Sequence, residues 1–209
     1  MRQDPRQNHL RPRLIVGITG ASGVVYGARL LTLLKNLPVE THLVISRSAE
    51  MTLALETDLK PADLRARADV AHAIGDIAAP ISSGSFQTLG MIIAPCSIRS
   101  MSEIASGVTT TLLTRAADVV LKERRRLVLA VRETPLHTGH LRTMTALSEM
   151  GAVIAPPVPA FYAKPQTLDE MIDHSLGRLL DLFGFDSGTV RRWGEAPATA
   201  KTDTAEPQN

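Results

Sequence analysis

The segment that decides the fold reads LIVGITGASG from Leu14 to Gly23 and continues as VVYGARLL from Val24 to Leu31. An apolar run, a glycine-containing turn and a second apolar segment predict a buried strand followed by a helix. Glycine permits backbone angles that other residues avoid and lets a ligand come close to the main chain. Because the free N–H groups at the start of a helix attract anions, we predict that this turn is a phosphate-binding site.

Strand and helix patterns alternate along the rest of the chain. Further strands are expected at 39–45, 89–94 and 126–131, with a short one near 153–154 and helices in most of the segments between them. The run from Leu127 to Val131 is continuously apolar, as in a parallel strand covered on both faces. Segment 74–86 is rich in Gly, Pro and Ser and is expected to be a loop. The alternation predicts an α/β fold with a single, doubly wound parallel sheet.

Composition limits the class of protein. A chain of 209 residues fits one domain, which we place at 13–194, between polar arms at 1–12 and 195–209 that are expected to be disordered. No apolar run approaches the ~20 residues that span a bilayer. The net charge of +2 is too small to suggest a general nucleic-acid-binding protein. The single cysteine and the lack of an apolar N-terminal signal favour a cytoplasmic location.

Polar side chains follow several of the predicted strands. Ligands of doubly wound sheets bind beyond the carboxyl ends of the strands. The groups expected there are the 19–23 turn, Ser46, the 97–100 segment, and Arg132 with Glu133. Each of them has a simpler explanation as a connection, a helix cap or a surface ion pair. Their convergence on one edge predicts a binding site there.

The glycine spacing narrows the type of nucleotide. The pattern from Gly17 to Gly23 is G-x-x-G-x-x-G, which is not the dinucleotide-binding G-x-G-x-x-G, and no Gly-Lys-Ser/Thr follows it. Dinucleotide-binding proteins also place an acidic residue near the end of the second strand, where this chain has Ser46. The TGASG string resembles short-chain dehydrogenases, yet neither Tyr26 nor Tyr162 is followed four residues later by the lysine of their chemistry. A mononucleotide fits better than a dinucleotide.

Matches to one family extend over nearly the whole chain, from about Leu14 to Glu195. Together they resemble the UbiX-type flavin prenyltransferases. The segments that carry the resemblance are the 20–23 turn, Ser46, 56–58, 95–97, 115–119, 122–124, 132–136, 159–162 and 192–194.

The resemblance implies a Rossmann-like or flavodoxin-like three-layer sandwich that binds FMN. A transferase of this type joins a dimethylallyl group from dimethylallyl monophosphate to N5 and C6 of reduced FMN without a metal. The implied assembly is a homododecamer with its sites at subunit junctions. The product, prenylated FMN, would serve a UbiD-type decarboxylase, and neither nucleic acid nor a membrane is an expected partner.

By matching position, the resemblance also implies roles for individual residues. Ser22 would lie near the reactive edge of the flavin, Glu133 would handle protons, Trp193 would wall the allyl group, and Lys122 and Glu56 would complete the catalytic set. Residues expected to hold FMN are Gly20, Ala21, Ser22, Ser46, Ser97, Ile98, Arg99, Ser100 and Arg132. Those expected to bind the donor phosphate are Lys122, Tyr162, Arg178 and Arg115, with Arg115 and Glu56 supplied by neighbouring subunits.

The chemistry of an allylic phosphate suits these residue types. Its ionisation separates a carbocation from a phosphate dianion, so the site needs fixed cations at the leaving group and π-rich walls around the allyl group. Arginine and lysine meet the first need, and Trp193 meets the second. A monophosphate leaves poorly without metal activation, which makes a general acid such as Glu133 plausible.

Other interpretations stay open at this level. The chain could be a non-catalytic FMN-binding subunit of a hydroxyarylic acid decarboxylase complex. An FMN-dependent cysteine decarboxylase is disfavoured because the string PCSIRS at 95–100 lacks the asparagine of that family. Arg99 and Ile77 depart from positions where UbiX-type proteins often carry lysine or tryptophan, which leaves details of the donor open.

Two further motifs have ordinary explanations. His137 and His140 have a spacing found in metal sites, but no cysteine or further histidine lies near them in the sequence, so a pair at a helix start is preferred. Cys96 could be a nucleophile, although a small buried apolar residue is the commoner role.

Overall fold

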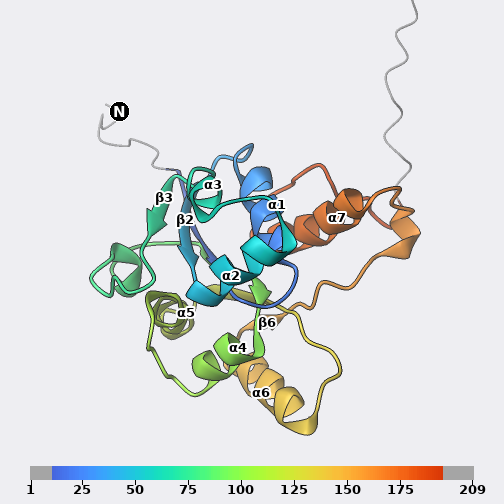
Figure 1. Cartoon of the computed structure of the whole chain (residues 1–209). Helices are drawn as coiled ribbons and strands as arrows, with labels where there is room; N and C mark the ends of the chain where they lie inside the picture. The colour runs from blue at the N-terminus through green and yellow to red at the C-terminus, as the bar shows by residue number, and fades with distance from the viewer. Residues whose placement is uncertain (1–10, 195–209) are drawn as a thin grey trace, which may run out of the picture.

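The structure is a computed structural model that describes residues 11–194 (Figure 1). The arms expected at 1–12 and 195–209 lie outside the described residues except for the last two positions of the first. Arg11, one of these two residues, donates hydrogen bonds to the Val39 carbonyl at 3.2 Å and to Asp69 at 2.6 Å. The described chain therefore begins already attached to the edge of the sheet.

The centre of the molecule is one sheet of six parallel strands in the order β3-β2-β1-β4-β5-β6. This order confirms the predicted doubly wound fold and is the Rossmann order, with the reversal of direction between β1 and β4. The strands are β1 (Arg13–Ile18), β2 (Glu40–Ile45), β3 (Val70–His72), β4 (Gly90–Cys96), β5 (Arg126–Val131) and β6 (Val153–Ile154).

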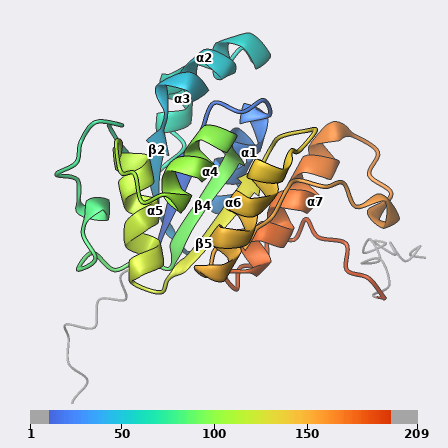
Figure 2. The same cartoon turned by 90° about the horizontal axis from the view of Figure 1, so that it is seen from below.

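Helices cover both faces of the sheet, as Figures 1 and 2 show. Helices α1 and α7 pack on one face, together with the short α2 and α3, and α4, α5 and α6 pack on the other. Their bounds are α1 (Val24–Leu34), α2 (Arg47–Glu56), α3 (Pro61–Arg65), α4 (Ile98–Ala105), α5 (Leu112–Lys122), α6 (Thr138–Glu149) and α7 (Leu168–Asp181). Short 3-10 turns lie at Pro80–Ser82 and Phe161–Ala163.

The alternation of side chains along β1 builds both halves of the core. Leu14, Val16 and Ile18 enter the core beneath α1 and α7, whereas Ile15 enters the core beneath α4 to α6. A strand buried on both faces must be apolar at every position, which explains the unbroken run in the sequence. Burying one such aliphatic side chain contributes about 1.5–3 kcal/mol.

β3 was not predicted. It has only three residues, two of them exposed, and it pairs with β2 alone. The loop expected at 74–86 begins directly after it and contains the 3-10 turn with the buried Ile81.

Hydrogen bonds join the carboxyl ends of the central strands. Thr19 is buried, and its hydroxyl donates to the Pro95 carbonyl at 2.8 Å and accepts from the Ser97 N–H at 2.7 Å. The Arg132 N–H donates to the Cys96 carbonyl at 3.0 Å. The edge on which the predicted binding residues converge is thus fixed by the fold itself.

Within residues 11–194, no helix is long and apolar enough to cross a membrane.

Candidate active site

The turn after β1 is already occupied by a carboxylate of the same chain. The Glu56 Oε2 atom accepts hydrogen bonds from the N–H groups of Gly23 at 2.8 Å and Val24 at 3.0 Å. These are the donors at the start of α1 that would bind a phosphate. Within this chain Glu56 uses these donors, and a phosphate site at this turn stays a prediction. Glu56, expected to come from a neighbouring subunit, contacts the turn of its own chain.

Glu56, Ser22 and Arg132 form an electrostatic cluster at this turn. Burial by itself raises the pKa of Glu56, but hydrogen bonds from the Ser22 hydroxyl and from the Gly23 and Val24 N–H groups, with the positive charge of Arg132, bring its pKa below the ordinary value. Glu56 is therefore an anion at neutral pH. The Ser22 hydroxyl, predicted to lie near reacting atoms, is held by a charged acceptor.

A hydroxyl-rich cavity of about 450 Å³ opens beyond the ends of β2 and β4. We call it the hydroxyl cavity. It brings together the predicted FMN residues Ser46, Ser97, Arg99 and Ser100. Side chains that the sequence did not single out also line it, namely Arg47, Ser48, Met51, Ile74, Thr110 and Thr111.

Helix caps explain why hydroxyls gather in this cavity. The Ser46 Oγ accepts from the Ala49 N–H at 3.1 Å, and the Ser97 Oγ accepts from the Ser100 N–H at 3.3 Å. The cap interpretation of these serines is therefore correct, and it places both hydroxyls at the cavity wall. Thr111 caps α5 in the same way. A Ser or Thr before a helix was the signal that could have found Thr111.

The 20–22 turn lies directly against this cavity. A Cβ atom at Gly20 would come within 2.4 Å of the Ser48 Cβ, so only glycine permits this approach. Among the remaining predicted FMN residues, Ile98 is half-buried against the core, and Ala21, Ser22 and Arg132 do not line the hydroxyl cavity.

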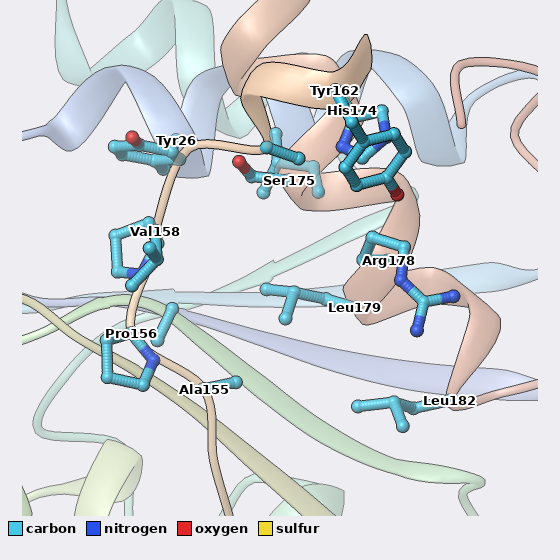
Figure 3. Close-up of a pocket in the computed structure, with 14 residues that line it drawn as sticks. Tyr26, Ala155, Pro156, Val158, Tyr162, His174, Ser175, Arg178, Leu179 and Leu182 are labelled. Atoms are coloured by element: carbon cyan, nitrogen blue, oxygen red, sulfur yellow. The ribbon is translucent and has the colours of Figure 1, made fainter. Parts of the chain in front are cut away.

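The second cavity has a volume of about 380 Å³ and lies between the start of α1, the loop after β6 and α7 (Figure 3). We call it the aromatic cavity. Tyr162, His174 and Arg178 lie on one side of it and Tyr26 on the other (Figure 3). Tyr162 and Arg178 were both predicted to bind the donor phosphate, and the fold brings them together. Tyr26 and His174 were missed, since nothing in the local sequence marks them.

Trp193 stands next to Tyr162. The two rings meet edge to face, with centroids 5.2 Å apart and planes at 83°. Trp193 is 80% exposed, a large value for an indole. Its position beside the aromatic cavity fits the role of an apolar wall.

The positive charge of Arg132 acts on two groups near the start of α1. Burial raises the pKa of Tyr26, and the positive charge of Arg132 partly opposes this shift. The same guanidinium acts on Glu56 beside the turn. Arg132 therefore acts on Glu56 beside the turn and on Tyr26, which lines the aromatic cavity.

Glu133 follows Arg132 directly after the end of β5. Its Oε1 atom accepts from the Thr134 N–H at 2.9 Å, and all residues from 132 to 139 are exposed in the single chain. Its placement at the carboxyl edge agrees with the prediction.

Lys122 and Arg115 are not part of this arrangement within one chain. Both lie on α5, which covers the opposite face of the sheet from α7. Lys122 pairs with Glu123, and Arg115 pairs with Asp118 at 2.7 Å. They can reach an aromatic cavity only if it belongs to another copy of the chain, as was expected for Arg115 but not stated for Lys122.

Cys96 and the histidine pair carry no site. Cys96 is fully buried, and burial raises its pKa to about 12, so it remains a protonated thiol and a poor nucleophile. The rings of His137 and His140 have centroids 3.6 Å apart, but the His137 Nδ1 accepts from the Gly139 N–H at 3.0 Å as the cap of α6. Over residues 11–194, no three His, Cys, Asp or Glu side chains are grouped so as to hold a metal ion.

Comparison with known proteins places this architecture among flavoproteins. Residues 2–180 match the family model described as Flavoprotein. The chain is 63% identical over 172 residues to flavin prenyltransferase UbiX of Escherichia coli K12, an alignment that covers 82% of this chain and 91% of the relative.

Solved structures agree with the sequence match. The crystal structure of AnUbiX (PadA1) in complex with FMN and dimethylallyl pyrophosphate has a TM-score of 0.87 at 52% identity and covers 90% of this chain and 100% of that one. A dodecameric FMN-dependent UbiX-like decarboxylase from Escherichia coli O157:H7 has a TM-score of 0.85 at 50% identity, with 88% and 100% covered.

Proposed function

The chain belongs to the flavoprotein family and, within it, to the UbiX flavin prenyltransferases, and from this premise we propose that it transfers a dimethylallyl group from dimethylallyl monophosphate to N5 and C6 of reduced FMN. It is a transferase that uses FMN and makes prenylated FMN. The observation that carries the more specific proposal is the presence of two cavities of different chemistry, one lined by hydroxyls and arginines and the other by aromatic side chains and Arg178.

The hydroxyl cavity suits the polar part of FMN. Its serine and threonine hydroxyls can bond a ribityl chain, and Arg47 and Arg99 offer positive charge for a phosphate. Arg99 is paired with Glu103 at 2.9 Å in an exposed position, where such a pair is weak enough to be exchanged for a ligand. Reduced FMN, when bound, supplies the two nucleophilic atoms that receive the prenyl group.

The aromatic cavity suits the prenyl donor. The Tyr162 hydroxyl and the Arg178 guanidinium can hold the phosphate, and Trp193 can face the allyl group, whose developing positive charge an indole stabilises. Arg178 is paired with Asp181 at 2.6 Å, and Asp181 also accepts from Arg192. Asp181 can therefore stay paired with Arg192 when Arg178 turns toward the phosphate.

Proton transfer falls to Glu133 in this proposal. Breaking the C–O bond of the donor leaves a phosphate that takes up a proton. New bonds at N5 and C6 would release one proton from each of these flavin atoms, and the allylic double bond would take up one of the two, which leaves one for the phosphate. A carboxyl group at the carboxyl edge beside Arg132 can exchange protons with both. Glu56 has a different role, because it fixes the Ser22 hydroxyl and neutralises part of the Arg132 charge.

Lys122 and Arg115 support a site completed by assembly. A dodecameric homologue is known at 50% identity. We propose that this chain also forms a homododecamer, in which these two residues enter the aromatic cavity of another copy and balance the charge of the departing phosphate. A cytoplasmic location and a UbiD-type decarboxylase that consumes the product complete the proposal.

The test is incubation of the pure protein with chemically reduced FMN and dimethylallyl monophosphate under anaerobic conditions. We expect one dimethylallyl group added to the flavin mass and one phosphate released per flavin. A parallel reaction with the diphosphate measures which donor is preferred. Flavin that binds tightly but gains no mass with either donor would overturn the proposal in favour of a non-catalytic FMN-binding subunit.

A further inference from the structure

His174 is a buried histidine beside the aromatic cavity that the proposed chemistry does not use. It lies on α7, is only 5% exposed and stands beside Tyr162 (Figure 3). Its ring meets the Tyr162 ring edge to face, with centroids 5.7 Å apart and planes at 83°. Tyr162 in turn meets Trp193 edge to face. His174 is therefore the buried end of a row of three perpendicular rings that runs to the surface.

The same histidine contacts the segment that carries Trp193. We call residues 187–193 the C-terminal strap. The His174 Nε2 lies 3.3 Å from the Arg191 carbonyl oxygen, two residues before Trp193. Because a carbonyl can only accept, Nε2 must carry the hydrogen in this contact. One imidazole thus touches Tyr162 with its ring and holds the strap with its N–H group.

Other contacts fix the strap to α7 on both sides of this bond. The Thr189 hydroxyl donates to the Asp173 carbonyl at 2.9 Å, and Arg192 donates two hydrogen bonds to Asp181 at 2.9 Å each. At Gly177, an added Cβ atom would come within 2.5 Å of the Val190 Cγ2. The strap therefore lies close against α7, and the His174–Arg191 bond joins it to the cavity wall together with the Trp193–Tyr162 ring contact.

A purely structural role would favour an apolar side chain at this position. Burying an imidazole removes two polar nitrogens from water, which costs free energy that a phenylalanine of similar shape would not lose. The bond to Arg191 recovers part of that cost, and it acts on the backbone next to Trp193.

We propose that His174 is a positioning residue for the prenyl donor: it holds Tyr162 and Trp193 in the orientation in which they receive dimethylallyl phosphate. The inference rests on the proposed function, because it assigns the donor to the aromatic cavity. His174 touches Tyr162 directly and acts on Trp193 through the Arg191 carbonyl.

The experiment measures donor binding without turnover. The protein is loaded with oxidised FMN, which cannot accept the prenyl group, and dimethylallyl monophosphate is titrated by calorimetry. The variant His174→Phe keeps an aromatic ring but loses the N–H group. We expect its Kd for the donor to rise about five- to tenfold, as for the loss of one hydrogen bond, while FMN affinity stays unchanged. His174→Gln, whose amide N–H can reach Arg191, should recover most of the donor affinity.

The second readout does not depend on ligand or activity. Trp193 is the only tryptophan of the chain, so its fluorescence reports the strap directly. In FMN-free protein, His174→Phe should lower the fluorescence anisotropy of Trp193 and increase its quenching by acrylamide, and His174→Gln should reverse both changes. If His174→Phe does not fold, His174→Met is compared with His174→Gln in its place.

His42→Phe is the matched control. His42 is 3% exposed and hydrogen-bonded through both ring nitrogens, to His72 and to Glu40, but it lies on β2, outside the residues that line the aromatic cavity. This variant should lose stability and keep donor affinity and Trp193 anisotropy. An equal loss of donor affinity in both variants, or native values in His174→Phe, would overturn the inference. A native protein that binds no donor would overturn the proposed function itself.

Discussion

The hydroxyl cavity and the aromatic cavity are built in different ways. The first is walled by helix caps, short side chains whose positions follow from the ends of β2 and β4. The second is lined by Tyr26 of α1, by the loop after β6 and by α7, and its proposed partners Lys122 and Arg115 lie on the far face of the sheet. In our proposal one chain supplies the hydroxyls for the flavin, whereas the site for the departing phosphate also takes residues from a second chain.

The largest expected effect is a loss of turnover without a loss of ligand affinity at either cavity. Glu133→Gln should lower turnover by about 10²- to 10³-fold, because it removes the proposed general acid. FMN affinity and donor affinity should stay within about twofold, since Glu133 lines neither cavity. Single-turnover kinetics with reduced FMN measure the first quantity and calorimetry the other two.

The matched control for this variant is Glu149→Gln, at the end of α6 and away from both cavities. It should show native turnover. Turnover of Glu133→Gln within a few fold of native would remove Glu133 from the mechanism.

A smaller effect should show that the two cavities bind different ligands. Tyr162→Phe should weaken donor binding by about fivefold through the loss of one hydrogen bond and leave FMN binding unchanged. Ser46→Ala should do the opposite, because its hydroxyl lines the hydroxyl cavity. Calorimetric titration of both ligands into both variants measures the four affinities.

Ser46→Ala should also lower the free energy of unfolding by about 1 kcal/mol, since Ser46 caps α2. If both variants weakened both ligands equally, the two cavities would form one undivided site.

The smallest expected effect concerns the turn after β1. Glu56 has a pKa below its ordinary value of 4.5 in the folded chain, so its charge stabilises the fold above that pH, and this contribution is lost as the pH falls through the lowered pKa. Glu56→Gln should therefore lower the free energy of unfolding by about 0.3–1 kcal/mol at pH 7, the usual range for an exposed carboxylate at a helix start.

Thermal unfolding of both proteins between pH 7 and pH 3 measures this difference. The gap should shrink toward the acid end, where the native carboxyl group is itself protonated. A gap that is independent of pH would mean that Glu56 stabilises the turn by packing or by neutral hydrogen bonds.

The predictability of the fold followed the burial of its strands. β1, β2, β4 and β5 are buried along most of their length, and each contains an apolar run, which in β2 is confined to 43–45, so the sequence predicted each of them. β3 has two exposed positions among three residues and pairs on one side only, so it carries no apolar pattern. It is also the strand that completes the Rossmann order, which the sequence could not separate from the flavodoxin-like one.

Site residues could be predicted from the sequence where their contacts are with near neighbours in the chain. Ser46 and Ser97 are caps, and a cap depends on a few neighbouring residues, so their positions could be read locally. Glu56 lies 33 residues from the turn that it binds, and the contact depends on the length and direction of α2. The role of Lys122 could be inferred from resemblance, but the copy of the chain in which it acts could not, because only the layers of the fold place α5 away from α7.

The position of α5 on the far face affects the order in which a new chain gains its functions. If Lys122 and Arg115 serve the aromatic cavity of another copy, a newly made single chain can take up flavin before it can ionise an allylic phosphate. The reactive carbocation would then form only after subunits have met and closed the cavity against water. Specific activity would fall on dilution below the dissociation range of the assembly, and the prenyl donor would be protected from wasteful hydrolysis by immature protein.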